Sequence, residues 1–393
     1  MNVYLVGSGS FPNGMAGTKR TMCYAKGLMA QGDSCHVICT HRLEINDNNL
    51  PDSGVYNDVI FTYPSGRIKH RNKLLCKLDW TILDSIRTFF YGLHVFSAND
   101  VVFMSERQLS MLFAVMLSAK IKRAKVVWEL CEHPMAVGNQ NSKWEHFTRW
   151  IDRLFVEPHY DGIVAISQNL CHYAEKHKKK DAKVQMIPIL VEDNFTEIDL
   201  PQESPYKIPY IIHTGTMLEQ KDSISKILNG FYRFKQKYAI ECKLVFTGPQ
   251  ANEKCPYLKN IRKMGLENDI ELLGFVTAEE IKRLQQHASM TIIYKSDNLQ
   301  TRNCFPTKLG EMLISAIPVI TTNVGDANLY LENGKSAFIV KENDYEALAD
   351  CIDFILEHPD IAREIGNAGR NVALHAFDPI ENGKKLHSFF SSL

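Results

Sequence analysis

The sequence predicts an α/β protein with two doubly wound parallel-sheet domains, and three observations lead to this prediction. Short β-branched runs of four to seven residues alternate with longer stretches of helical period, as parallel strands joined by crossover helices do. The alternation breaks between Pro188 and Pro209, where four prolines and no sustained period occur. Formal charge is positive over 1–190 and equally negative over 191–393, which separates the same two halves.

The strands follow from the runs of Val, Ile, Leu and aromatic residues, and the helices from the periodic stretches between them. In the first half we expect strands at 2–6, 36–39, 58–62, 100–104, 125–129, 162–166 and 184–187. In the second half we expect them at 210–213, 243–247, 270–273, 290–294, 318–321 and 337–340. The expected domains are 1–190 and 210–379, joined by a linker at 191–209, with a last helix at about 380–393 that is able to return to the first domain.

Composition excludes several classes of protein. With 393 residues, 45% hydrophobic and 23% charged, the chain is neither disordered, collagen-like nor a coiled coil. The formal net charge of zero argues against the strong positive electrostatic field of a dedicated nucleic-acid-binding protein. Ten cysteines without a C-x-x-C pair indicate reduced thiols, and the start of the chain shows no signal peptide. The longest uncharged apolar run, 111–117, is too short for a bilayer span of about 20 residues. We therefore expect a cytoplasmic protein whose membrane contact is at most peripheral.

The loop after the first strand is rich in glycine. It runs from Gly7 to Arg20, includes Gly17, and leads into a helix expected to begin near Thr18. Glycines allow close backbone approach, and a helix N-terminus favours an anion. A plain flexible loop is an equally good interpretation.

The segment from Arg302 to Ile320 carries the clearest chemistry. Pro306 suits the first turn of a helix, which would leave the N–H groups of Thr307, Lys308 and Leu309 as unpaired donors for a diphosphate. Lys308 adds a side-chain charge. Glu311, one turn further on, can accept hydrogen bonds from two ribose hydroxyls, or it can simply face solvent on an amphipathic helix.

This segment reads Asn303-Cys304-Phe305-Pro306 through to Glu311, and then Ser315-Ala316-Ile317-Pro318-Val319-Ile320. It resembles the pattern E-x-F-(P/G)-x-x-x-x-E followed by A-x-G-x-P-V-I of the family 4 glycosyltransferases, which have the GT-B fold of two Rossmann-like domains. The stretch from His213 to Lys221 is similar to that family's G-R-L-x-x-x-K loop, and Gly274-Phe275-Val276 is similar to its G-x-V turn. The resemblance is good from about 210 to 380 and weaker before.

The resemblance implies a role for each matching position. Glu311 would bind the ribose, Lys221 and the helix start at Thr307 would hold the leaving diphosphate, and the donor base would contact Gly274–Val276. The donor-binding candidates are Gly17, Gly215, Thr216, Lys221, Gly274, Phe275, Val276, Arg302, Phe305, Pro306, Thr307, Lys308, Leu309 and Glu311. Two positions depart from the pattern, because Asn303 stands at the family's first glutamate and Thr216 at its usual arginine. No D-x-D triplet occurs, which argues against a metal-dependent GT-A enzyme, so we expect neither a metal nor a cofactor.

Candidate catalytic residues are His133, Glu132, Asn303 and Lys221. His133 and Glu132 follow the strand at 125–129, and the resemblance implies a histidine in this loop near the transferred sugar. Either side chain could orient the acceptor hydroxyl or take its proton. A histidine beside a proline is also a common structural loop residue.

A basic stretch precedes an apolar helical face. The basic residues are Arg67, Lys69, Arg71, Lys73 and Lys77, and apolar residues follow at helical spacing up to Leu93. This arrangement is typical of contact with an anionic membrane or a lipid-linked acceptor. A core-packed helix after a solvated loop is the alternative.

Taken with the resemblance, the sequence predicts a retaining glycosyltransferase. It would move a sugar from a nucleotide diphosphate sugar donor to a hydroxyl of a glycan or lipid-linked glycan acceptor, in cell-surface polysaccharide biosynthesis. A nucleotide-sugar 2-epimerase of the same fold and a non-catalytic sugar-nucleotide-binding protein are the alternatives, the second because of Asn303.

Overall fold

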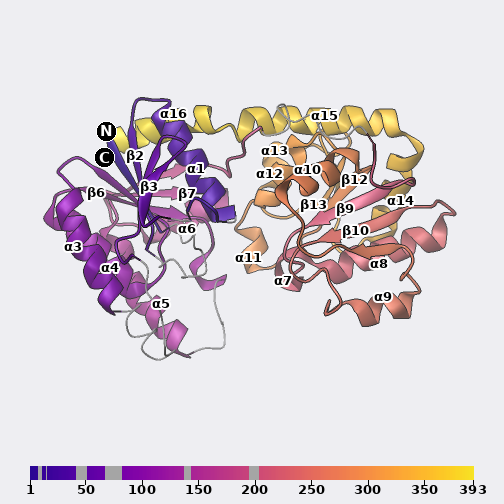
Figure 1. Ribbon diagram of the computed structural model, residues 1–393, viewed down its shortest axis with the longest axis horizontal. Helices are drawn as coiled ribbons and strands as arrows, with labels where there is room; N and C mark the ends of the chain where they lie inside the picture. The colour runs from indigo at the N-terminus through magenta and orange to yellow at the C-terminus, as the bar shows by residue number, and fades with distance from the viewer. Residues whose placement is uncertain (8–10, 15, 41–50, 67–81, 137–142, 194–202) are drawn as a thin grey trace. The chain divides into compact units, whose positions relative to one another are not determined.

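The structure is a computed structural model that describes residues 1–393 except 8–10, 15, 41–50, 67–81, 137–142 and 194–202. Its contacts divide the chain into two units, Met1–Leu190 together with Pro379–Leu393, and Val191–Asp378 (Figure 1). Val191 therefore belongs to the second unit, where its N–H donates to the carbonyl of Phe377.

The first unit is built on an eight-stranded sheet in the order β3-β4-β2-β1-β5-β6-β7-β8. Its strands are β1 (Asn2–Val6), β2 (Ser34–Ile38), β3 (Ser53–Tyr56), β4 (Val59–Thr62), β5 (Val101–Met104), β6 (Lys125–Leu130), β7 (Gly162–Ala165) and β8 (Lys183–Met186). Because β1 lies between β2 and β5, the chain winds outward from it in both directions, which confirms the doubly wound prediction.

One strand was absent from the prediction. β3 pairs antiparallel with β4 at the edge of the sheet. The two strands are joined by Asn57 and Asp58, which have φ angles of 46° and 63°. A two-residue turn of this kind suits a hairpin. Its signal is weak in the sequence because Gly54 interrupts the apolar run and the strand is largely exposed.

Helices cover both faces of this sheet. They are α1 (Ala16–Met29), α3 (Asp84–Val95), α4 (Leu109–Ile121), α5 (Lys143–Phe155), α6 (Gln168–His177) and α16 (Pro379–Ser391), with short 3-10 turns at Pro134–Ala136 and Glu157–His159. α1 begins at Ala16, two residues before the predicted start, so Gly17 lies in its first turn. α16 packs on α1, and a Cβ at Gly27 would lie 2.1 Å from the carbonyl oxygen of Pro379.

The second unit has a six-stranded, wholly parallel sheet in the order β11-β10-β9-β12-β13-β14. Its strands are β9 (Tyr210–Thr214), β10 (Lys243–Thr247), β11 (Ile270–Leu272), β12 (Met290–Ile293), β13 (Val319–Thr322) and β14 (Phe338–Val340). Its helices are α7 (Glu219–Asp222), α8 (Ile224–Lys237), α9 (Leu258–Met264), α10 (Ala278–His287), α11 (Leu299–Arg302), α12 (Thr307–Ile314), α13 (Ala327–Tyr330), α14 (Tyr345–Glu357) and α15 (Pro359–Ala376). The observed strands agree with the predicted ones to within one or two residues.

In each sheet the strand order reverses direction at one place, the topological switch point. It lies at the carboxyl end of β1 in the first unit and of β9 in the second. Ligands of open parallel sheets bind at such points. Among the described residues no helix is both long and apolar enough to cross a membrane, and the nine described cysteines are free.

Candidate functional site

The loop after β9 is held in an unusual backbone conformation. Gly215 has a φ of +131°, and both Met217 and Ser223 have positive φ angles. A Cβ at Gly215 would lie 1.9 Å from Nζ of Lys308, so only glycine leaves room for that ammonium group. The loop thus turns sharply to admit a lysine from α12, a helix far along the chain.

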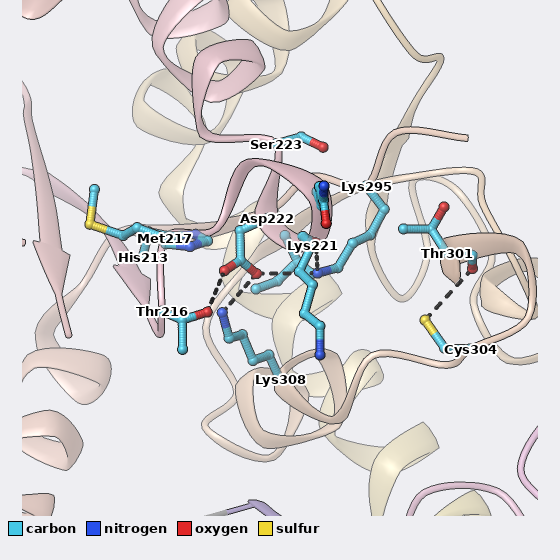
Figure 2. A network of polar contacts seen from close by, with 12 residues as sticks. His213, Thr216, Met217, Lys221, Asp222, Ser223, Lys295, Thr301, Cys304 and Lys308 are labelled. Carbon is cyan, nitrogen blue, oxygen red and sulfur yellow. Dashed lines mark hydrogen bonds and ion pairs between the residues drawn. The ribbon is translucent and has the colours of Figure 1, made fainter. Parts of the chain in front are cut away.

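Asp222 is the centre of the polar network that this loop makes (Figure 2). Its side chain is buried, yet it accepts a hydrogen bond from Nζ of Lys308 at 2.8 Å and one from Oγ1 of Thr216 at 3.3 Å. Nζ of Lys295 donates to the same carboxylate at 3.3 Å. Burial alone would raise the pKa of Asp222, but the two lysines hold it well below its usual range.

Lys295 ties this carboxylate to the predicted phosphate lysine. It follows β12, is itself almost fully buried, and donates a second hydrogen bond to the backbone carbonyl of Lys221. The backbone at Lys221 is therefore anchored while its side chain extends from the loop (Figure 2). Burial lowers the pKa of Lys308, with the charge of Lys295 acting in the same sense and Asp222 opposing both.

His213, on β9, completes the network as a neutral ring. Its Nδ1 lies 3.0 Å from the carbonyl oxygen of Ile292, which can only accept, so Nδ1 carries the proton. Nε2 is buried without a hydrogen-bond partner in the described part of the chain. Burial lowers the pKa of His213 to about 4, and the charge of Lys308 contributes in the same direction.

The start of α12 corrects one prediction. The N–H of Leu309 is not an unpaired donor, because it donates to the carbonyl of Pro306 at 2.9 Å. The reason is that Pro306 caps the helix in an extended conformation, so α12 begins at Thr307. Thr307 and Lys308 then provide the leading N–H groups of the helix. Glu311 lies one turn on, near enough for its charge to act on Lys308.

The residues just before α12 have largely structural partners. Phe305 was expected to contact the donor. Its side chain is instead buried against Tyr330 and Phe377, with ring centroids 5.2 and 5.0 Å away. Arg302 forms an exposed two-contact ion pair with Asp297. Asn303 is buried and its amide donates to the carbonyl of Leu299 at 2.7 Å, an interaction a glutamate could not make.

The predicted base-binding turn lies at the carboxyl end of β11. Gly274 has a φ of +68°, and its carbonyl accepts a hydrogen bond from the N–H of Gly248 at 2.7 Å. This bond ties the turn to the loop after β10. The ring of Phe275 is 79% exposed, so it offers a flat surface on which a base could stack.

In the first unit, the acceptor candidates lie after β6. Glu132 pairs with Arg107, which follows β5, at 2.8 Å. Nδ1 of His133 accepts the N–H of Met135 at 3.2 Å, and its ring lies edge-on to Tyr173. Burial lowers the pKa of His133, so the ring is neutral at pH 7 with its proton on Nε2.

The structure adds residues that sequence reasoning missed. Lys295 and Asp222 were not predicted, and neither were Arg107 or the ion pair of Arg20 and Glu129, whose Nε and Oε1 atoms lie 2.5 Å apart. Each lies near the carboxyl end of a strand or in the first helix after it, and that position was the available signal. The basic residues Arg67, Lys69, Arg71, Lys73 and Lys77 lie outside the described residues.

Comparison with known proteins identifies the second unit. Residues 195–372 match the model of the family described as "Glycosyl transferases group 1". Most of the second unit is therefore similar to a glycosyltransferase group 1 domain. This domain contains Lys221, Asp222, Lys295, Lys308 and Glu311, so the network described above lies within the matched residues.

Similar proteins extend the comparison. A trehalose synthase of Thermococcus litoralis is 28% identical over 149 residues, which cover 36% of this chain and 34% of that protein. The capsular polysaccharide biosynthesis glycosyltransferase CapM of Staphylococcus aureus is 32% identical over 95 residues, 22% of this chain and 25% of that protein. The chain thus matches about a third or less of the length of these curated relatives.

A solved structure extends the likeness to both units. HepE of Anabaena, in complex with UDP and glucose, superposes with a TM-score of 0.70 over 100% of both chains at 13% identity. Such a likeness shows the fold, and the GT-B fold predicted from the sequence is confirmed. Among the described residues, no three His, Cys, Asp or Glu side chains are grouped as they would be around a metal ion.

Proposed function

We propose that this chain is a retaining glycosyltransferase. It transfers a hexose or N-acetylhexosamine from a nucleotide diphosphate sugar to a hydroxyl of a glycan or lipid-linked glycan, in the synthesis of a cell-surface polysaccharide. The observation that carries the proposal is the gathering of the Lys295 and Lys308 ammonium groups around the carboxylate of Asp222, with the backbone of Lys221 held by Lys295, at the switch point of the domain. An excess of positive charge at such a point suits a diphosphate.

The network supports departure of the diphosphate. A glycosyl transition state resembles an oxocarbenium ion, so negative charge grows on the leaving oxygen, and groups aimed there lower the barrier. The side chain of Lys308 can turn from Asp222 to that oxygen while its backbone stays in α12, and the first N–H groups of α12 add a fixed partial charge. Glu311 would hold the ribose, and His133 or Glu132 would orient the acceptor hydroxyl.

The relatives support the finer points of the proposal. CapM bears a name from capsular polysaccharide biosynthesis, and HepE binds UDP and glucose in its crystals. A nucleoside diphosphate donor and a polysaccharide product are therefore the first to test. We also propose that the enzyme is cytoplasmic, acts peripherally at the inner face of the membrane, and needs neither metal nor cofactor.

The test has two steps. A thermal-shift panel of nucleoside diphosphates and nucleotide sugars should give selective stabilisation by one base, and Glu311→Ala should lower its affinity by about tenfold. The stabilising donor is then incubated with and without glycan acceptors, in buffer and in EDTA. Transfer that depends on the acceptor, survives EDTA and retains the anomeric configuration would support the proposal.

Other outcomes would refute parts of it. Conversion of the donor sugar without any acceptor would indicate a 2-epimerase. Selective nucleotide binding with no product from any acceptor would indicate a binding protein. Unchanged nucleotide affinity in Glu311→Ala would remove the ribose assignment, and inversion of the anomeric centre would remove the retaining mechanism.

A further inference from the structure

Helix α5 exposes its apolar face to solvent and turns its polar face toward the rest of the unit. Trp144, Phe147, Trp150 and Leu154 recur at spacings of three and four, so they share one face, and all are exposed. Trp144 is 70% exposed and Trp150 55%. A helix packed on a soluble domain normally turns this face inward.

The opposite face of α5 is polar and turned inward. Arg149 and Asp152 are only partly exposed, and Arg149 pairs with Glu145 at 3.0 Å. The pKa of Asp152 is raised to about 7 because the carboxyl is buried and lies near the charge of Glu157. The helix would have to rotate to bury its tryptophans, and this rotation would expose the polar contacts to solvent. The packing of the unit therefore holds the apolar face outward.

Helix α4 also exposes apolar side chains. Phe113, Leu117 and Ile121 form the outward row of α4, and all three are exposed. Val156, directly after α5, and Leu112 of α4 belong to one buried cluster, so both helices lie on the same side of the sheet. α3 packs on α4 and carries an exposed Phe90. Figure 1 shows the three helices in the first unit.

We propose that this face, named here the α5 face and made of Trp144, Phe147, Trp150, Leu154 and Phe155, inserts into the interface of a membrane bearing anionic lipids. Tryptophan and phenylalanine on one side of a helix, with basic groups at the margin, are the composition of interfacial helices. The charged side chains of α5 that are exposed, Lys143 and Arg153, are both basic, whereas Glu145 and Asp152 are partly buried. Lys143 precedes the apolar face and can extend its ammonium to the headgroups.

The charge at the margin favours lipid over a second protein copy. A self-complementary interface would bring Lys143 and Arg153 of one copy near those of another, whereas an anionic surface attracts both. The inference deepens the peripheral membrane contact proposed above. It is tested without donor or acceptor, so its failure would remove the proposed membrane contact and leave the proposed sugar transfer standing, and failure of sugar transfer would leave the membrane contact standing.

The experiment is co-sedimentation of the full chain with vesicles of phosphatidylglycerol and phosphatidylcholine in equal parts, and with phosphatidylcholine alone. We expect stronger binding to the anionic vesicles, weakened by salt, with a blue shift of tryptophan fluorescence. Phe147→Ser with Trp150→Ser should lower the partition coefficient by about tenfold or more. The matched control is Leu329→Ser with Ile361→Ser, both in the second unit and, like Phe147, 48% exposed.

Charge is tested separately. Lys143→Glu with Arg153→Glu should reduce binding to anionic vesicles by more than about fivefold per residue, because each change removes a basic group and adds an acidic one, and should leave binding to neutral vesicles unchanged. Lys335→Glu with Arg363→Glu, in the second unit, is the control. Trp144→Phe with Trp150→Phe should retain binding and lose the blue shift.

Two results would overturn the inference. Vesicle binding that is absent, or equal in wild type and in Phe147→Ser with Trp150→Ser, would exclude the α5 face as a membrane contact. A concentration-dependent dimer that the same substitutions dissociate, without vesicle binding, would assign the face to a second copy of the chain.

Discussion

The ammonium group of Lys308 donates a hydrogen bond to the buried carboxylate of Asp222 over 2.8 Å. The two residues are 86 positions apart in the chain. Their contact joins the loop after β9 to the start of α12, the two segments that a diphosphate at this switch point would touch. The carboxylate of Asp222 neutralises part of the positive charge that such a ligand would bind. Ligand binding and the stability of the fold would therefore depend on the same charges.

Asp222→Asn should destabilise the protein and increase the stabilisation that a bound nucleoside diphosphate gives. The substitution leaves Lys308 and Lys295 buried without their counter-charge, a loss of about 3 kcal/mol in the free energy of unfolding. A nucleoside diphosphate can replace that charge, so its stabilising effect should be larger in the variant than in wild type. Urea unfolding with and without the ligand measures both. Asp360→Asn is the control, since that side chain is 92% exposed. Equal ligand effects in variant and wild type would separate Asp222 from the binding site.

Gly215→Ala should weaken nucleotide binding more than it weakens the fold. A methyl group there would displace Nζ of Lys308, and the φ of +131° adds backbone strain of about 1–3 kcal/mol. Gly334→Ala separates the two effects, because Gly334 also has a positive φ but no atom lies within 4 Å of its Cβ position. Isothermal titration should show lost affinity in Gly215→Ala alone. Similar affinities in both variants would mean that Lys308 need not occupy its observed position.

The parallel sheets could be predicted from the sequence because each buried strand is a nearly continuous apolar run. β9, for example, reads Tyr-Ile-Ile-His-Thr and is buried throughout. β3 escaped prediction because an exposed edge strand with a glycine lacks that signal. The relative position of Lys308 and Glu311 could be predicted because both lie on α12, where their spacing places them one turn apart.

The Asp222 network could not be predicted, because it depends on contacts that the fold creates. Lys295 lies 73 residues after Asp222 in the chain and follows β12. The two residues meet only because β9 and β12 are neighbours in the sheet. Phe305 was misassigned for the same reason. Its position in the motif is that of a donor contact, but Tyr330 and Phe377 enclose its ring.

Lys221→Ala should lower turnover by roughly 10²-fold with little change in stability. The ammonium group is proposed to stabilise charge that develops on the leaving diphosphate, and one such donor contributes on the order of 10²-fold. The assay is sugar transfer at saturating donor, compared with Lys226→Ala, whose exposed ammonium contacts Asn343. Turnover within twofold of wild type would exclude the leaving-group role.

His213 should make the protein sensitive to acid. Its pKa is lowered to about 4 in the folded state, mainly by burial, and the unfolded value is about 6.5. The folded state therefore binds fewer protons between these values, and stability falls as the pH drops from about 6.5 toward 4, by on the order of 2–3 kcal/mol. His213→Asn, which can still donate to the Ile292 carbonyl, should flatten this part of the profile. An unchanged slope in denaturant unfolding across that range would contradict the neutral buried ring.

Asp152 should give a pH dependence of the opposite sign. Burial and the charge of Glu157 raise its pKa to about 7, so the folded state binds more protons than the unfolded state between about pH 4 and 7. The contribution of Asp152 to stability is therefore lost as the pH rises through that range. Asp152→Asn should raise the free energy of unfolding at pH 8 by roughly 2 kcal/mol, less than the full shift implies because the side chain is partly exposed, and change it little at pH 4. Since Asp152 lies on the inward side of α5, this variant should bind anionic vesicles as wild type does. Equal gains in stability at pH 4 and pH 8 would show that the carboxyl is not protonated in the fold.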